Sequence, residues 1–281
     1  MSKKTPSGSD TTSVISDLSV KLKTLREEAR KQSLSPRARR ALEAEIREVM
    51  NGLGAFLSEL DPIKQPSAMF DPSNPKVVGR FVSLALVAQT RQPLSDVSSF
   101  YGSGVYAIYY TGKHPLYTPL SKSETPIYVG QTAPTDKNAR TPSEQGDKLS
   151  SRLVEHQKNI QKASSSLDIK DFEYRALVVQ SGWETAAEDY LIHLFHPIWN
   201  SETKLLFGLG KHGDSSDTRA NKRSPWDTLH PGRAWAADKK ILDSKSPDRI
   251  KSELSEHFKA HPVFQKMETL LSSFIEELKQ V

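Results

Sequence analysis

Residues 104–110, Gly-Val-Tyr-Ala-Ile-Tyr-Tyr, and residues 126–130, Pro-Ile-Tyr-Val-Gly, are the two runs that decide the fold of this chain. Both are rich in β-branched and aromatic side chains, the composition typical of β-strands. A polar loop at residues 111–125 separates them, which predicts an antiparallel hairpin. A third run of the same kind, residues 172–179, predicts a further strand.

Helical patterns lie on both sides of these strands. Apolar residues recur at helical spacing in two N-terminal segments, which predicts two amphipathic helices joined by a short turn. Residues 147–161 and 183–195 are expected to be helices, and Pro75, Pro247 and Pro262 each to open one. The apolar positions of the N-terminal pair are Val14, Leu18, Leu22, Leu25 and Ala29, followed by Leu42, Ile46, Val49, Leu53, Leu57 and Leu60.

The chain divides into regions of different composition. Its first residues are rich in serine, threonine and lysine, a composition that predicts disorder. Four prolines between Asp61 and Pro75 indicate a linker. The expected regions are a disordered tail (1–12), an N-terminal helical region (13–100), a core (101–202), a basic, glycine-broken region (203–245) and C-terminal helices (246–281).

The composition of the chain excludes several classes of protein. The 281 residues carry a formal net charge of +5, which favours a polyanionic partner without establishing one. The chain has no cysteine, which excludes disulfides, thiolate zinc sites and thiol nucleophiles. Neither a signal peptide nor an apolar run long enough to span a bilayer is present, so we expect a soluble cytoplasmic protein with no membrane partner.

Several polar side chains have the chemistry that phosphodiester hydrolysis needs. That reaction requires an activated water, neutralisation of charge at the phosphate and help for the leaving oxygen. Tyr106 and Tyr128 lie in the two hairpin strands. Arg152 and His156 are one helical turn apart and share a face. Glu188 lies beside the apolar face of an expected helix.

Each of these signals has an ordinary structural alternative. Tyrosines in strands commonly pack across the sheet, and Arg152 with His156 would fit a solvated helix face. Glu188 taken alone fits an exposed glutamate, and Asp189 is the neighbouring alternative. Asn200 alone would fit a turn or a cap. The order and spacing of the whole set therefore carry the argument.

That order and spacing resemble the GIY-YIG nuclease family. The family's two triplets correspond to Gly104-Val105-Tyr106 and Tyr128-Val129-Gly130, with valine in place of isoleucine in both, which preserves β-branching. The resemblance covers residues 101–202. It implies an α+β fold whose core is a small three-stranded antiparallel sheet flanked by helices, with helical N- and C-terminal extensions.

The resemblance also implies roles for the residues around the sheet. Tyr106 would be the general base or would position the attacking water, and Tyr128 would hold the water or the phosphate. Arg152 would stabilise the charge on the phosphorane. His156 looks like a variant of the family's restriction-enzyme branch, where it contacts the scissile phosphate or the catalytic tyrosine.

A divalent cation is part of the same expectation. By the resemblance, Glu188 would bind one Mg²⁺ per active site, and that ion would assist the leaving 3′ oxygen. Asn200 would support the site.

The basic region resembles one group of type II restriction enzymes, which cut the palindrome CCGCGG. Arginine and lysine pair bidentately with guanine in the major groove, so a GC-rich site would suit this region. The alternative is that these side chains contact only phosphates or solvent. The expected DNA-binding residues are Lys211, His212, Arg219, Lys222, Arg223 and Arg233.

Cleavage of both strands of a palindrome implies symmetry. One core has one active site, so we expect a homo-oligomer, with a dimer as the minimum and a tetramer also compatible. The N-terminal helical hairpin and the C-terminal helices are candidate interfaces. A restriction enzyme in a bacterial cytoplasm would also have a DNA methyltransferase as its functional partner.

Two other functions are alternatives to a type II restriction endonuclease. A structure-specific or repair nuclease of the same superfamily would cut flaps or junctions without preferring a palindrome. A DNA-binding module that has lost catalysis would not cut, and the presence of all five motif residues argues against it.

Overall fold

The computed structural model describes residues 8–31, 36–60, 63, 69–210, 222–238 and 240–279. The chain forms two compact units, residues 1–68 and residues 69–281. Within the described residues, no helix is both long enough and apolar enough to cross a membrane.

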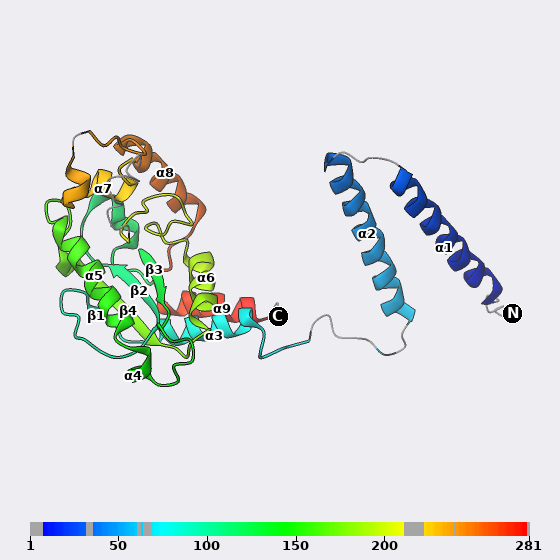
Figure 1. Ribbon diagram of the computed structural model, residues 1–281, viewed down its shortest axis with the longest axis horizontal. Helices are drawn as coiled ribbons and strands as arrows, with labels where there is room; N and C mark the ends of the chain where they lie inside the picture. The colour runs from blue at the N-terminus through cyan, green and yellow to red at the C-terminus, as the bar shows by residue number, and fades with distance from the viewer. Residues whose placement is uncertain are drawn as a thin grey trace. The chain divides into compact units, whose positions relative to one another are not determined.

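The first unit contains two long helices, α1 (Gly8–Lys31) and α2 (Pro36–Leu60), which confirms the predicted helical pair (Figure 1). α2 begins at Pro36, where a missing backbone N–H and a fixed φ suit the first helical turn. α1 already begins at Gly8, so residues 8–12 are helical where a disordered tail was expected.

The second unit is built on an antiparallel sheet with the strand order β1-β4-β2-β3. β2 (Gly104–Tyr110) pairs with β3 (Tyr128–Thr132) in the predicted hairpin and with β4 (Phe172–Val178) on its other side. The three predicted strands are therefore confirmed. The sheet has a fourth strand, β1 (Gln92–Pro93), which pairs with β4 at the edge. Two residues are too few to show alternation, and proline is tolerated at an edge.

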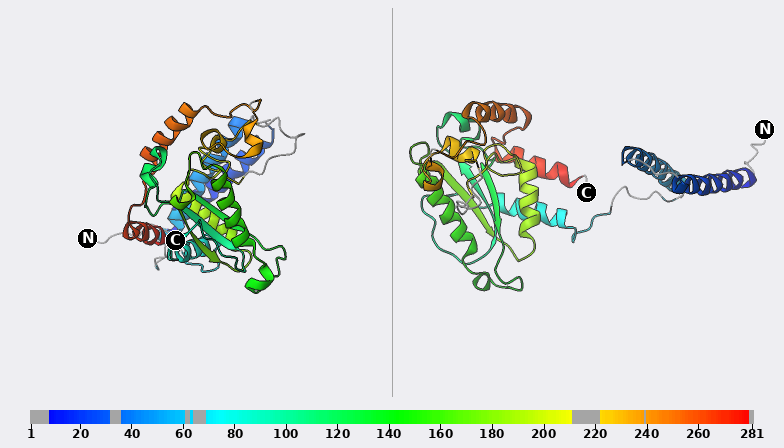
Figure 2. Two further views of the ribbon diagram at one scale, coloured as in Figure 1. Left: turned by 90° about the vertical axis from the view of Figure 1, so that its left-hand side faces the viewer. Right: turned by 45° about the horizontal axis from the view of Figure 1, so that its top comes forward.

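Helices cover both faces of the sheet, as Figure 2 shows. α3 (Pro75–Val87), α6 (Glu184–Phe195) and α9 (Met267–Leu278) pack on the face that carries Val105, Ala107 and Tyr109. α5 (Lys148–Lys162), α7 (Pro225–Leu229) and α8 (Pro247–Ala260) share the core on the opposite face. Every residue of β2 is consequently buried. The shorter helical elements are α4 (Pro142–Gln145), η1 (Pro115–Leu120), η2 (Ile169–Asp171) and η4 (Ala234–Ala237).

Two element boundaries differ from those predicted. α3 packs against α6 and the sheet, so residues 75–87 belong to the second unit and not to a separate N-terminal helical region. The last helix begins at Met267, not at Pro262. The segment before it is held by hydrogen bonds to residues that precede β3. The Phe264 amide donates to Thr125 Oγ1, and the Phe264 carbonyl accepts from the Glu124 amide. These bonds replace the helical ones.

Candidate active site

Four of the predicted side chains meet on the α5 face of the sheet. The hydroxyl of Tyr106 lies 2.7 Å from Nε2 of His156. The Tyr128 ring is 5.0 Å from the His156 ring and 6.1 Å from the Tyr106 ring, measured between centroids. The Arg152 guanidinium, on the preceding turn of α5, interacts electrostatically with both phenols. Because residues 152 and 156 lie one turn apart, the helix presents both to the two strands.

Gly130 makes this arrangement sterically feasible. Tyr106 is opposite Gly130 in the β2–β3 register. A Cβ at residue 130 would lie 2.4 Å from the Tyr106 hydroxyl oxygen, well inside van der Waals contact. The second glycine of the motif is therefore required because the Tyr106 side chain lies directly on its backbone.

Burial keeps both phenols protonated. Desolvation raises the pKa of Tyr106 well above its usual value, and the neighbouring Tyr128 adds to this, whereas the Arg152 charge opposes it. Desolvation likewise raises the pKa of Tyr128, again against Arg152. The guanidinium of Arg152 also pairs with Glu155, three residues along α5. The sequence signal for this pair is the spacing of three residues along one helix.

Glu188 approaches the same edge of the sheet from the opposite face. It lies on α6, and the backbone amide of Gln131, the residue that follows the second triplet, lies close enough to its carboxylate to lower the pKa. β3 is an edge strand, so a side chain from α6 and side chains from α5 can meet beside it. The site thus lies at the β3 edge, between α5 and α6.

The environment of Glu188 favours a cation. Burial, together with the nearby carboxylates of Glu202 and Asp189, raises the pKa of this carboxyl to about 7, while the Gln131 amide and Arg152 act in the opposite direction. Among the described residues, no group of three or more histidine, aspartate or glutamate side chains could hold a metal ion. One carboxylate with water and phosphate oxygens is, however, a common way of binding Mg²⁺. The residues therefore fit a single divalent ion.

Asn200 supports the site without reaching the reacting groups. Its side-chain oxygen accepts from the Val129 amide and its nitrogen donates to the Val129 carbonyl, both at 2.9 Å. The residue is buried, and the pair of bonds fixes the middle of the Tyr128-Val129-Gly130 triplet. The supporting position expected for Asn200 therefore has a definite geometry in this fold.

The expected DNA-binding residues fall into three groups. Lys211, His212 and Arg219 lie outside the described residues. Lys222 is exposed. Arg223 donates to the carbonyls of Ala236 and Asp238 and to the carboxylate of Asp243, so its guanidinium is used within the chain.

Arg233 is a correction to the predicted DNA-binding set. Its side chain is only 3% exposed and forms an ion pair with Asp227, whose side chain is fully buried. The guanidinium also donates to the carbonyls of Gly208 and Leu209. A side chain enclosed in this way cannot reach a base edge, so Arg233 stabilises the basic region from within.

The segment that these bonds fix also contacts Arg152. A Cβ at Gly210 would lie 2.7 Å from Nη2 of Arg152. Asn159 of α5 donates to the Leu209 carbonyl at 3.1 Å, and Leu209 itself is buried. From the sequence alone, Gly208 and Gly210 are expected only to interrupt local structure. Their close approach to Arg152 has no local sequence signal, because it depends on contacts between distant segments.

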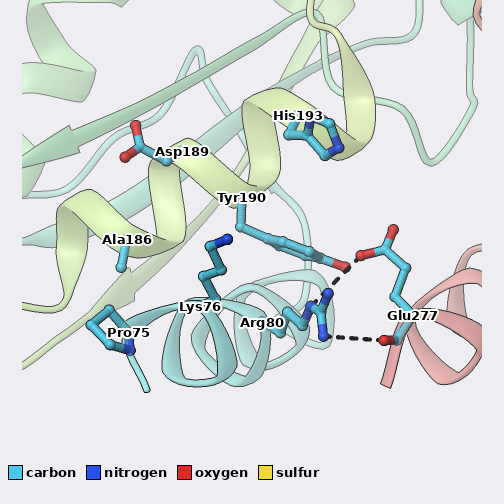
Figure 3. Close-up of a pocket in the computed structure, with 8 residues that line it drawn as sticks. All are labelled: Pro75, Lys76, Arg80, Ala186, Asp189, Tyr190, His193 and Glu277. Carbon is cyan, nitrogen blue, oxygen red and sulfur yellow. Dashed lines mark hydrogen bonds and ion pairs between the residues drawn. The ribbon is translucent and has the colours of Figure 1, made fainter. Parts of the chain in front are cut away.

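A pocket of about 660 Å³ lies elsewhere on α6, between α3 and the end of α9 (Figure 3). Arg80 is joined there to Glu277, and Asp189 and His193 line the α6 side. Asp189 is adjacent to Glu188 in sequence but faces this pocket. Tyr106, Tyr128 and Arg152 do not line this pocket, so it is distinct from the candidate site at the β3 edge.

A small antiparallel sheet with two tyrosines on paired strands, an arginine on the covering helix and a glutamate across the edge defines a nuclease core of the GIY-YIG type. Residues 98–258 match the family model described as the Eco29kI GIY-YIG domain. The match covers more than half of the 281 residues, and the chain belongs to this restriction-endonuclease family. It is therefore a nuclease with DNA as its substrate. No curated protein matches the chain.

Proposed function

We propose that this chain is a type II restriction endonuclease that cuts both strands of DNA at a short GC-rich palindrome. The observation that carries the proposal is the convergence of Tyr106, Tyr128, Arg152 and His156 opposite Glu188 at one strand edge. We take CCGCGG as the first candidate site, because the basic region resembles enzymes with that target.

Tyr106 activates the attacking water together with His156. The phenol is protonated in the free protein, because burial raises its pKa. Its hydroxyl is 2.7 Å from Nε2 of His156, so a neutral imidazole accepts the phenolic proton. As the water adds to phosphorus, its proton passes to the Tyr106 oxygen and the phenolic proton passes to His156. The pair thereby avoids an isolated buried phenolate.

Arg152 and Tyr128 orient and neutralise the phosphate. The guanidinium remains charged and can bind two phosphate oxygens at once. Its exposed fraction of 25% leaves it accessible to DNA from solvent, while Glu155 forms an ion pair with it. Tyr128 donates its hydroxyl hydrogen to the phosphate or to the attacking water. The Arg152 cation and the Tyr128 hydroxyl donor therefore stabilise the negative charge that develops on the phosphorane.

Glu188 would hold one Mg²⁺. When bound, that ion supplies charge neutralisation at the phosphate and at the leaving 3′ oxygen. The carboxylate must be ionised to bind it, and the Gln131 amide keeps the side chain directed to the β3 edge. Asn200 keeps that edge in register through Val129.

Recognition and assembly complete the proposal. Lys211, His212, Arg219 and the exposed Lys222 are the side chains we propose to contact DNA. Each chain has one active site, so cutting both strands of a palindrome requires at least a dimer. Such an enzyme works in a bacterial cytoplasm beside a methyltransferase that protects the host sequence.

Digestion of a plasmid of known sequence, with and without Mg²⁺, tests this function. Discrete metal-dependent fragments with ends at one GC-rich palindrome are expected. Cutting confined to flaps or junctions would instead identify a structure-specific nuclease, and no cutting in any divalent metal would identify a DNA-binding module.

Glu188→Ala tests the metal assignment in the same assay. Cleavage should fall below detection while specific DNA binding, measured by gel shift in Ca²⁺, is retained. Asp189→Ala is the matched control, because it removes the adjacent carboxylate that faces away from the edge, and it should still cut at pH 8. Comparable cleavage by Glu188→Ala would remove Glu188 from the metal site.

A further inference from the structure

α1 and α2 carry apolar residues with the heptad period of a helical bundle. The steps along each helix alternate between three and four residues, giving the 3.5-residue repeat of helices that pack lengthwise. The seam positions are Ile15, Leu18, Leu22, Leu25 and Ala29 in α1, and Leu42, Ile46, Val49, Leu53, Phe56 and Leu60 in α2.

Most of this seam is open to solvent. Apart from the half-buried Ala29 and Leu42, the seam side chains are between 39% and 63% exposed. α1 and α2 make no extended contact with each other along their lengths. Two helices with exposed apolar seams of 15 and 19 residues would be unstable in water without a partner, because helix stability comes mainly from packing of the apolar face.

The width of the apolar stripe indicates how many neighbours it needs. In α2, Met50 and Leu57 lie directly beside the seam, and both are exposed. In α1, Val14 lies beside the seam and is also exposed. A stripe of three to four apolar residues per two turns is typical of a helix in a bundle, whereas a two-stranded coiled coil buries only the seam. Two helices of one chain cannot cover such stripes, but four helices can.

Charges beside the seams specify which helices pair. Lys21 and Arg26 flank the seam of α1, whereas Glu45 and Glu59 flank the seam of α2. None of these four side chains forms an ion pair within the described residues, unlike Glu28 and Glu43, which pair with residues of their own helix. The basic side chains beside the seam of α1 and the acidic side chains beside the seam of α2 complement each other, so a second copy of the same hairpin supplies the matching surface.

We propose that the α1–α2 hairpins of two copies associate into a four-helix bundle in which α1 of one chain lies against α2 of the other. The hairpin lies outside residues 98–258, so this interface is an addition to the family domain. The inference does not rest on the proposed DNA cleavage, and its tests measure association alone.

Site-directed cross-linking of the full-length chain tests where the contact lies. The chain has no cysteine, so single introduced cysteines are unambiguous probes. A mixture of Leu22→Cys and Leu53→Cys chains, treated with a short bis-maleimide, should give a covalent dimer containing one chain of each kind. Thr24→Cys with Ser58→Cys, on the outer helix faces, is the matched control and should give none. Equal cross-linking by both mixtures would overturn the proposal.

Charge reversal separates pairing between chains from pairing within one chain. One variant carries Lys21→Glu with Arg26→Glu, and the other carries Glu45→Lys with Glu59→Lys. Each alone should lose the seam cross-link, and mixing the two should restore it, because an acidic α1 then meets a basic α2. Far-ultraviolet circular dichroism checks that both variants keep their helices. If mixing fails to restore the cross-link, the hairpins do not pair across two copies.

Discussion

At the scale of single residues, the proposed mechanism depends on the hydrogen-bonded pair of Tyr106 and His156 and on the glycine against which Tyr106 packs. Tyr106 is held between the Gly130 backbone and His156, so its hydroxyl has little freedom to move. The same burial that fixes the phenol also disfavours its ionised form. Geometry and electrostatics together therefore make His156 the acceptor through which Tyr106 would act as a base.

Tyr106→Phe tests that pair directly. The variant keeps the ring that packs on Gly130 but removes the proton carrier, so we expect cleavage to slow by about 10²- to 10⁴-fold, the usual contribution of general base catalysis. Single-turnover cleavage measures the effect. Tyr110→Phe, on the same strand and face, removes a hydroxyl that only accepts from the His114 amide and should leave the rate nearly unchanged. A near-native rate for Tyr106→Phe would remove this residue from the base role.

The charge around Glu188 predicts the pH dependence of cleavage. Its pKa of about 7 means that below neutral pH a proton competes with Mg²⁺ for the carboxylate. Asp189→Asn removes one of the charges that raise this pKa, so Glu188 would ionise at lower pH. The acid limb of the rate profile at limiting Mg²⁺ should therefore move to lower pH. An unchanged limb would show that another group controls it.

At the scale of elements, sequence patterns predicted the strands and helices that bear the site but not how they approach one another. The triplets of β2 and β3 and the helical spacing of Arg152 and His156 are local features, and both were found as predicted. β1 was missed because two residues show no period. The meeting of Glu188 with α5 side chains around an edge strand depends on strand order, which no local pattern contains.

Arg233 illustrates why a basic segment is a poor guide to DNA contacts. Sequence alone cannot distinguish a cation that faces DNA from one that pairs with a buried carboxylate, because both occur among glycines and other polar residues. Here Asp227, six residues earlier, determines the outcome. Asn200 shows the converse: its site was predicted, but its two bonds to Val129 require the folded chain.

Substitution of Arg233 should therefore change stability and not sequence preference. Arg233→Ala leaves Asp227 buried without its partner, which typically costs about 3–5 kcal/mol of unfolding free energy. Urea denaturation measures the loss, and end sequencing of the residual cleavage products should show the same site. Lys222→Ala is the exposed control: its stability should stay within about 0.5 kcal/mol of the parent chain. A changed cleavage site in Arg233→Ala would restore Arg233 to a role in recognition.

At the scale of the whole molecule, buried histidines make stability depend on pH. Burial lowers the pKa of His230 to about 3, with a further contribution from His114, and lowers that of His257 to about 4. Above pH 6.5 these groups are neutral in both states. Below pH 6.5 these histidines become protonated in the unfolded chain but stay neutral in the folded chain. The free energy of unfolding should therefore fall as the pH drops from 6.5 towards 4.

His257→Gln isolates one of these groups. The His257 ring donates from Nε2 to the His196 carbonyl at 3.0 Å, a bond that a glutamine amide can replace. The variant should lose the titration, so its unfolding free energy should vary less steeply below pH 6.5, by up to about 1.4 kcal/mol per pH unit. Denaturant titrations at pH 7, 6 and 5 measure the slope. An equal slope in both proteins would show that His257 is not part of this dependence.

The buried pair of Arg233 and Asp227 has a consequence for how such enzymes diversify. Arg233 fixes the carbonyls of Gly208 and Leu209, and Asp227 binds the hydroxyl of Ser224, which lies against Gly208. One ion pair thus joins the segment that ends at Gly210 to the segment that follows Lys222. Related enzymes can therefore change exposed side chains of these two segments while Arg233 and Asp227 keep the backbone beside Arg152 in its place.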